Sequence, residues 1–275
     1  MVLPALLALA SPASAQSRWD ALAYGSSLSY ADSRVKSGGV IAGVYGTYGT
    51  GYRHLVEVGA AWTGIDNRDG SRLSQTDASV AYSLFGSRVS GRLGAHVISS
   101  SDALTDGGFV LFGGASVYRL GTWSAGAEAA WSSYPDYPGG LDVIQAAPSA
   151  GFTAYTGDSG VLAGTVRGYV IHLSDDPGLG ATDFFSAEAS LGYTVGDWTV
   201  SGFAWGGEQV FAVRDGGFLA FNLSELHTGG FGGGVRWVLT PRTALSGGLA
   251  VERFQDVGFA GDAWARLFSL SLGLT

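Results

Sequence analysis

Cysteine is missing from this chain, and proline and charge are scarce. Of its 275 residues none is Cys, 7 are Pro and only 14% are charged, whereas typical domains carry about 25% charged residues. Without cysteine the protein can hold neither a disulfide framework nor a thiolate metal site. So few charged residues are unusual for a protein whose whole surface is exposed to water. We therefore expect that charge is not what solvates this surface.

Long hydrophobic runs and clustered basic residues are also lacking. After residue 15 no apolar stretch approaches the roughly 18 residues that a membrane-spanning helix needs, which excludes a helical membrane protein. Lys and Arg number 15 against 23 Asp and Glu, a net charge of −8, and Lys36 is the one lysine. Phosphate binding needs clustered Lys and Arg, so this balance argues against a nucleic acid partner.

The first residues have the pattern of a secretory signal peptide. Val2 to Ala10 form a short apolar run, and the small residues Ala13, Ser14 and Ala15 follow as a cleavage site. We therefore expect residues 1–15 to be removed and the mature chain to begin near Gln16.

The rest of the chain is rich in glycine, with 45 Gly, and in aromatic residues, which make up 12%. Segments of about ten residues alternate between apolar and polar side chains. This is the pattern of β-strands whose two faces lie in different environments, one apolar and one polar. One example places Val56, Val58, Ala60 and Trp62 on one face and Glu57, Gly59, Ala61 and Thr63 on the other. Disorder is excluded because aromatic and β-branched residues are abundant.

The connections between these segments alternate along the chain between short and long. Six are tight turns rich in residues that tolerate positive φ: 48–51, 85–88, 120–122, 156–160, 195–197 and 239–242. Seven are longer and polar: 31–39, 66–71, 99–108, 134–140, 174–183, 214–225 and 255–262. Thirteen connections join about fourteen strands and leave both termini on the short-turn side, an asymmetry that a soluble sandwich does not explain.

Aromatic residues gather at the ends of the expected strands, where the headgroup level of a membrane favours them. They are Trp62, Tyr82, Phe85, Trp123, Trp131, Tyr193, Trp198, Trp237 and Trp264. Together these patterns resemble the bacterial outer-membrane β-barrel superfamily. The resemblance implies an all-β, transmembrane, antiparallel up-and-down barrel over residues 16–275, located in the outer membrane in contact with its lipid and lipopolysaccharide. The end Gly273-Leu274-Thr275 departs from the aromatic end common in such barrels.

Charged residues within the strands fall on the face opposite the apolar one, which in a barrel is the lumen. They are Glu57, Asp77, Arg92, Glu128, Arg167, Glu188, Arg236 and Glu252. An arginine facing lipid would cost about 2–4 kcal/mol near the midplane, so this phase supports the strand assignment. These charges either form a ring that sets the ion preference of a channel or pair across strands to hold the wall.

One group of aromatic residues differs from the rest. Phe203 and Trp205 are expected to point inward, and the nearby loop that contains Phe218 and Phe221 is apolar. Such a loop either folds into the mouth of the barrel or contacts lipid or a hydrophobic solute. A simple aromatic belt at the membrane surface is the alternative.

Signals of catalysis are weak. Residues 157–160, Gly-Asp-Ser-Gly, match a serine protease tetrapeptide, but no base or orienting acid accompanies them in sequence. His54, His96, His172 and His227 lack metal-ligand spacing. We therefore expect no catalytic residues, no metal and no cofactor. Aspartates in the long connections either bridge divalent cations to lipopolysaccharide phosphates or form a solvated surface; they are Asp66, Asp69, Asp102, Asp106, Asp175, Asp176 and Asp183.

The sequence thus predicts a non-enzymatic, porin-like channel for the passive diffusion of small solutes. A structural barrel that anchors or binds a partner of an exported assembly is the first alternative. A barrel hydrolase acting on lipid is the second. The solute, the open state of the lumen and the oligomeric state are not determined by these patterns.

Overall fold

The computed structural model describes residues 17–275 except 52, 156–159, 257 and 260. The expected signal peptide, residues 1–15, lies outside the described residues, as do Gly157, Asp158 and Ser159 of the protease-like tetrapeptide. Among the described residues, no helix is long and apolar enough to cross a membrane.

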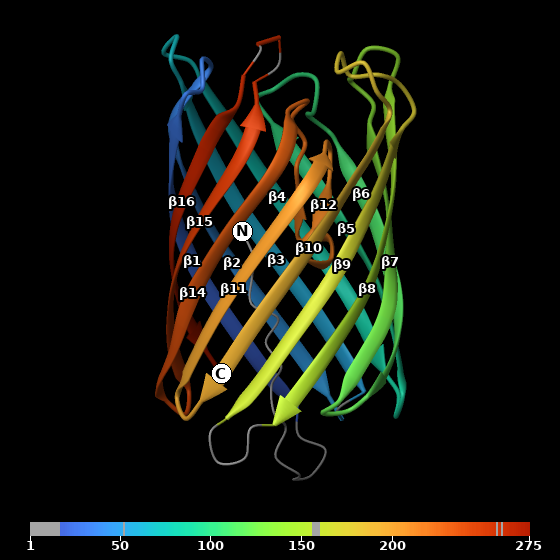
Figure 1. The fold of residues 1–275 in the computed structure, drawn as a ribbon, viewed down its shortest axis with the longest axis vertical. Coiled ribbons are helices and arrows are strands. Elements are labelled where there is room, and N and C mark those ends of the chain that lie inside the picture. Colours follow the sequence, from blue (N-terminus) through green and yellow to red (C-terminus); the bar gives the residue numbers. More distant parts are fainter. Residues whose placement is uncertain (1–16, 52, 156–159, 257, 260) are drawn as a thin grey trace.

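Fourteen antiparallel strands close into a single barrel (Figure 1). They are β1 (Arg18–Ala31), β2 (Lys36–Thr50), β3 (His54–Asn67), β4 (Arg72–Phe85), β5 (Val89–Ser100), β6 (Phe109–Arg119), β7 (Trp123–Tyr134), β8 (Leu141–Tyr155), β9 (Val161–Leu173), β10 (Asp183–Val195), β11 (Trp198–Gln209), β14 (Leu226–Thr240), β15 (Thr243–Gln255) and β16 (Ala263–Leu274). Each strand pairs with its neighbours in the chain, and β1 closes the barrel against β16. The predicted fold class and the strand number are confirmed.

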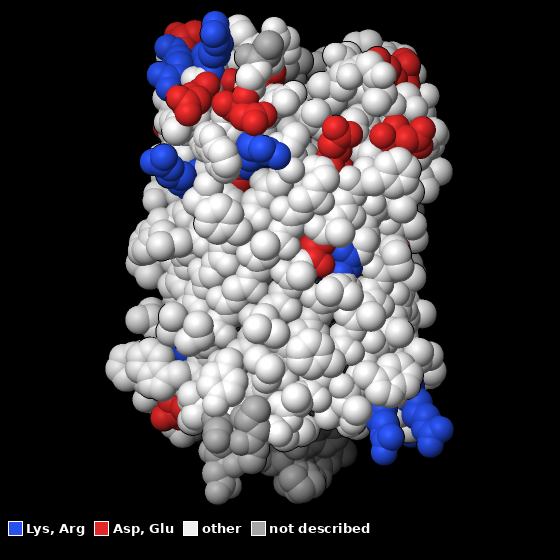
Figure 2. Space-filling model, viewed as in Figure 1, with Lys and Arg blue, Asp and Glu red and all other residues white. Residues whose placement is uncertain are grey.

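The alternation predicted from the sequence sets which side chains face outward. On β5, Leu93 and Val97 are 70% and 54% exposed on the outer face, whereas His96 between them is 2% exposed. Figure 2 shows the resulting belt, in which charged groups are nearly absent at mid-height and gather at the two ends. An apolar outer face and a polar inner face are the arrangement of a barrel that sits in lipid.

Aromatic pairs mark both ends of this belt. Trp198 and Trp237 stack at 5.0 Å near the short turns, and Phe109 and Trp131 meet edge to face at 5.2 Å near the long loops. They fit the two girdles of a membrane barrel.

The strands are 11–15 residues long, which exceeds the expected ten and shortens the connections. The largest correction is at the first long connection, expected over 31–39, because β2 already begins at Lys36. Lys36 pairs in register with Asn67 of β3, so pairing with the neighbouring strand extends this one past the apolar belt.

The two ends of the barrel differ as expected, with β1 starting and β16 ending at the short-turn end. We predict that cysteines placed at Gly70 or Asp176, in long loops, react on intact cells with a thiol reagent that cannot cross the membrane. A cysteine at Gly196, in the β10–β11 turn, should react only after the cells are broken. The reverse labelling would invert this orientation.

One connection departs from the up-and-down pattern. Residues 210–225, between β11 and β14, enter the barrel as a hairpin of β12 (Val213–Arg214), the 3₁₀ turn η2 (Asp215–Gly217) and β13 (Leu219–Ala220) (Figure 1). We call residues 210–225 the inserted segment. Asp215, Gly216 and Gly217 have φ values of 49°, 61° and 93°, so the tip turns through three left-handed residues in succession.

Candidate functional site

The lumen and the inserted segment form the candidate site, and the wall supplies two of its ion pairs. Arg92 Nη2 of β5 lies 3.1 Å from Glu57 Oε2 of β3. Arg167 Nη2 of β9 lies 3.6 Å from Glu128 Oε1 of β7. These four predicted lumen residues therefore pair across the wall, as one of the two interpretations of the sequence has it.

Glu188 and Glu252 meet an arginine that the sequence analysis did not single out. Arg214, 3% exposed in the inserted segment, forms an ion pair with Glu188 of β10 and lies 3.3 Å from Glu252 Oε1 of β15. A guanidinium that leaves water needs charged partners, and the two carboxylates supply them. This buried triad joins the inserted segment to two strands at once.

Asp77 and Arg236 complete the set of predicted lumen charges. Asp77 Oδ1 lies 2.9 Å from His96 Nε2, and the other ring nitrogen of His96 lies 3.0 Å from the carbonyl oxygen of Gly217 at the segment's tip. Arg236 stands in register between Thr199 and Ser246, toward the short turns. No carboxylate among the described residues forms an ion pair with Arg236.

The apolar side of the inserted segment packs against the wall from β4 to β10. Val210, Phe211 and Ala212 are completely buried. Phe211 meets Tyr134 of β7, with the ring centroids 4.9 Å apart. The wall residues in the same cluster are Ala81, Ile98, Val110, Phe112, Ala130, Tyr134, Leu141, Val143, Ile171, Leu173 and Phe184. This is a protein-like core inside the barrel, and it holds the segment at the long-loop half of the lumen.

Backbone and side-chain hydrogen bonds fix the same segment elsewhere on the wall. Gln145 of β8 donates to the carbonyl oxygen of Val213 at 2.6 Å and accepts from its amide at 2.9 Å.

Across the barrel, Asn222 donates to Gln75 Oε1 of β4 at 2.8 Å, and Lys36 Nζ of β2 lies 2.5 Å from Glu225 Oε2. Both Lys36 and Glu225 are buried. The inserted segment therefore bridges the lumen from β2 and β4 to β8 and β10.

The predicted aromatic residues lie around this segment. Phe218 covers Gly59 of β3, where a Cβ would stand 3.0 Å from the Cδ1 atom of its ring, so glycine makes the contact possible. Phe221 stacks on His227 at 4.5 Å. Trp205 lies under the Arg214 guanidinium at 5.2 Å, and Phe203 folds over Gly232. Of the alternatives drawn from the sequence, the structure shows the loop folded into the barrel.

Toward the short turns the lumen is lined mainly by hydroxyl groups. Ser90 and Ser116 share a hydrogen bond of 2.8 Å, and Thr194 and Thr199 one of 3.0 Å. Further inward positions in this half are Ser124, Thr153, Thr165, Ser190, Ser201, Ser246, Ser269 and Ser271. Small hydroxyl side chains leave space and offer both donors and acceptors, which suits water and polar solutes.

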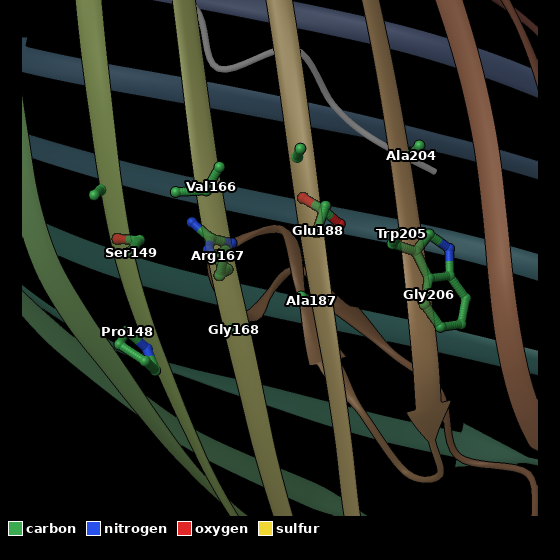
Figure 3. A pocket seen from close by; sticks show the side chains of 12 residues that line it. Pro148, Ser149, Val166, Arg167, Gly168, Ala187, Glu188, Ala204, Trp205 and Gly206 are labelled. Atoms are coloured by element: carbon green, nitrogen blue, oxygen red, sulfur yellow. The ribbon is translucent and has the colours of Figure 1, made fainter.

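A hollow of about 670 Å³ lies across β8 to β11 (Figure 3). Outward-facing Ala189, Ala204 and Val166 line it together with Arg167 and Glu188 of the lumen. Figure 2 shows one acidic and one basic group reaching the surface at mid-height of the belt. Here only small side chains separate the charged lumen from the outside.

Proline interrupts the sheet beside this hollow. The pairing of β8 with β9 is continuous up to Ala146 and resumes at Ser149 in the same register. Pro148, between them, has no N–H to donate and stands opposite Gly168. The wall is therefore locally weaker in hydrogen bonds without a shift in register.

No metal centre is found within the described part of the chain, where no group of three or more His, Cys, Asp or Glu residues could hold an ion. The loop aspartates are engaged locally instead. The Ser100 amide donates to Asp106, and the amides of Leu179, Gly178 and Gly180 donate to Asp176. These hydrogen bonds hold the pKa of both carboxyl groups below the usual range.

Comparison with known proteins finds likeness in structure only. No family model and no curated protein matches the sequence. The chain is similar to the CymD monoaromatic hydrocarbon channel, with a TM-score of 0.57 at 10% identity over 93% of this chain and 88% of that one. It is similar to a bacterial polysaccharide outer membrane secretin, with a TM-score of 0.55 at 11% identity over 92% and 97% of the two chains. A Pseudomonas aeruginosa FadL homologue gives 0.54 at 11% identity over 93% and 90%.

At these identities the likeness establishes the fold. It agrees with the closed barrel. The apolar outer belt and the aromatic pairs are observed in this chain itself. The chain therefore has the architecture of the outer-membrane β-barrels that it resembles, with an apolar outer surface suited to lipid.

Proposed function

We propose that this barrel is a channel for small polar solutes, narrowed by the inserted segment. The observation that carries the proposal is the division of the lumen into two parts. Hydroxyl groups and wall-bound charges line the half near the short turns, and the inserted segment spans the half near the long loops. A polar interior supports passage of water-soluble molecules, and a bridging segment limits their size.

The alternatives predict different behaviour. An anchoring barrel needs no continuous path through the lumen and would gain no conductance when the inserted segment is altered. A lipid hydrolase needs a nucleophile beside a base, and no described hydrogen bond joins a histidine to a serine. His54 lies 2.6 Å from the Tyr82 hydroxyl, and His172 lies 2.8 Å from Asp183. The CymD monoaromatic hydrocarbon channel is among the solved structures similar to this one, which supports the channel proposal by analogy.

Conductance in a planar lipid bilayer tests the proposal. The mature chain, refolded in detergent and inserted at symmetric salt, should give stepwise currents. Folding of the barrel is checked separately by its altered migration in unheated gels. A folded barrel that gives no current, even after the inserted segment is deleted, would contradict the channel function.

Charge reversal inside the lumen should change ion selectivity. We expect Arg236→Glu to shift the reversal potential in a salt gradient toward cations, because Arg236 has no described ion-pair partner to offset its charge. Arg92→Glu should act in the same direction and also repel Glu57, its partner at 3.1 Å. Arg88→Glu, in the exposed β4–β5 turn outside the lumen, is the matched control. Equal reversal potentials for Arg236→Glu and the control would show that ions do not pass this arginine.

A further inference from the structure

Basic residues at the long-loop end of the barrel are confined to one side. Between Arg72 and Arg253, every Lys or Arg lies in or next to a short turn, in the lumen or in the inserted segment. The basic residues at the long-loop end belong to strands β15, β16 and β1 to β4 or to their loops: Arg34, Lys36, Arg68, Arg72, Arg253 and Arg266. Figure 2 shows blue groups at the upper left of this end and only red ones at the upper right.

Two of these arginines face outward on neighbouring strands with a tryptophan between them. Arg253 of β15 is paired in register with Trp264 of β16, and Arg266 follows two residues later on the same face. Diagonal neighbours of this kind are roughly 7–8 Å apart. The side chain of Ser29, paired with Arg266 from β1, is on the same face and exposed. We call Arg253, Trp264, Arg266 and Ser29 the outer basic patch.

The patch stands at the upper edge of the apolar belt. Below Arg266, the outward residues of β16 are Phe268, Leu270, Leu272 and Leu274, each between 44% and 50% exposed. Eight residues of a tilted strand rise roughly 20 Å, close to the full height of about 25 Å of a barrel's apolar band. Arg266 therefore lies at the headgroup level of the outer leaflet, where Trp264 also belongs.

The positive charge of the patch is only partly compensated within the protein. Arg253 Nη1 lies 3.6 Å from Asp262 Oδ2, with both side chains about 40% exposed, and its Nε donates to Thr228 Oγ1. By contrast, no carboxylate in the described part of the chain pairs with Arg266. An arginine at the lipid surface without an internal partner is best satisfied by an anion from the membrane itself.

We propose that the outer basic patch binds a phosphate group of an outer-leaflet lipid. Arg253 and Arg266 would hold the phosphate oxygens from two sides, Ser29 would donate a hydroxyl, and the Trp264 ring would lie against the lipid's sugar or acyl region. The ligand is a lipid phosphate because the patch lies on the outer face of the barrel, at the level of the lipid headgroups. The site is independent of the channel proposal, since it lies on the opposite face of the wall from the lumen.

Binding of purified lipopolysaccharide to the refolded barrel in detergent, followed by native mass spectrometry, tests the site. Wild type should retain one lipopolysaccharide molecule at low concentration. The double variant Arg253→Gln with Arg266→Gln should bind roughly tenfold more weakly or worse, as expected when two charges at a membrane surface are lost. Arg88→Gln, at the opposite end of the barrel, should bind like wild type.

Two further binding experiments use only the wild-type protein, so their results do not depend on whether a variant folds. Dephosphorylated lipopolysaccharide should lose the tight site, and millimolar inorganic phosphate should fail to displace the intact lipid. Unchanged binding of the dephosphorylated lipid would overturn the proposal. Displacement by inorganic phosphate would also overturn it, by showing a free-anion site in its place.

Discussion

Deleting residues 211–221 and closing the gap with a short Gly-Ser linker is expected to raise single-channel conductance several-fold. The inserted segment is the structure that bridges the lumen, from Gln75 on one side to Gln145 on the other. Barrels of eight strands are filled by their own side chains, whereas those of sixteen to eighteen hold an aqueous channel. A fourteen-stranded barrel with so many inward serines and threonines should be open once the segment is gone.

The deletion should leave the barrel folded. The wall is closed by hydrogen bonds between strands, from β1–β16 around to β11–β14, and none of these involves residues 211–221. Planar bilayer recording measures the conductance, and the resistance of the unheated protein to unfolding on gels measures the fold. A matched deletion in another long loop, residues 175–181, should leave conductance unchanged. Equal conductance of wild type and the 211–221 deletion would show that the segment does not restrict the path.

Replacing Arg214 by methionine is expected to release the inserted segment without removing it. Arg214 is 3% exposed between Glu188 and Glu252, so the substitution leaves two carboxylates in the lumen without their cation. Breaking a buried ion pair by removing one partner costs about 3–5 kcal/mol. If this cost falls on docking of the segment, the docked state is disfavoured by about 10² to 4 × 10³-fold.

Current fluctuations measure this release. The Arg214→Met channel should switch between a low and a high conductance, whereas wild type should remain at the low level. The triple variant Arg214→Met, Glu188→Gln, Glu252→Gln is the control, because replacing all three charges leaves none unpaired. It should restore a quiet, low-conductance channel. An Arg214→Met channel as quiet as wild type would show that the triad does not hold the segment.

Much of the fold could be predicted from the sequence because a barrel wall obeys local rules. Period-two alternation assigned residues such as Glu57 and Arg92 to the inner face, and the sorting of short and long connections gave the strand number. The alternating pattern predicts strands that are too short. At Lys36, for example, pairing with β3 extends β2 beyond the residues that alternate between apolar and polar.

For the inserted segment, the sequence indicated an apolar loop but not the ion pairs that hold it. Its apolar composition around Phe218 indicated a loop that does not belong in water, and folding into the mouth was one of the readings. Arg214 was missed because a single arginine at the start of a loop has no local sign of burial. Its partners Glu188 and Glu252 lie 26 and 38 residues away in sequence, and only the closed barrel brings them together.

A crosslink between the inserted segment and the wall tests the central claim most directly. In a chain without native cysteine, Gln75→Cys with Asn222→Cys replaces two side chains whose terminal amide groups lie 2.8 Å apart. Because contact between side-chain tips leaves the two Cβ atoms too far apart for a direct disulfide, the two thiols are joined by a short bifunctional thiol reagent that a reductant cleaves. The account predicts that the crosslink forms in the folded protein, that the crosslinked channel stays at one low conductance, and that adding the reductant lets it open more often. Failure of the crosslink to form in a folded barrel, or a large conductance in the crosslinked state, would contradict the claim that residues 210–225 narrow the lumen.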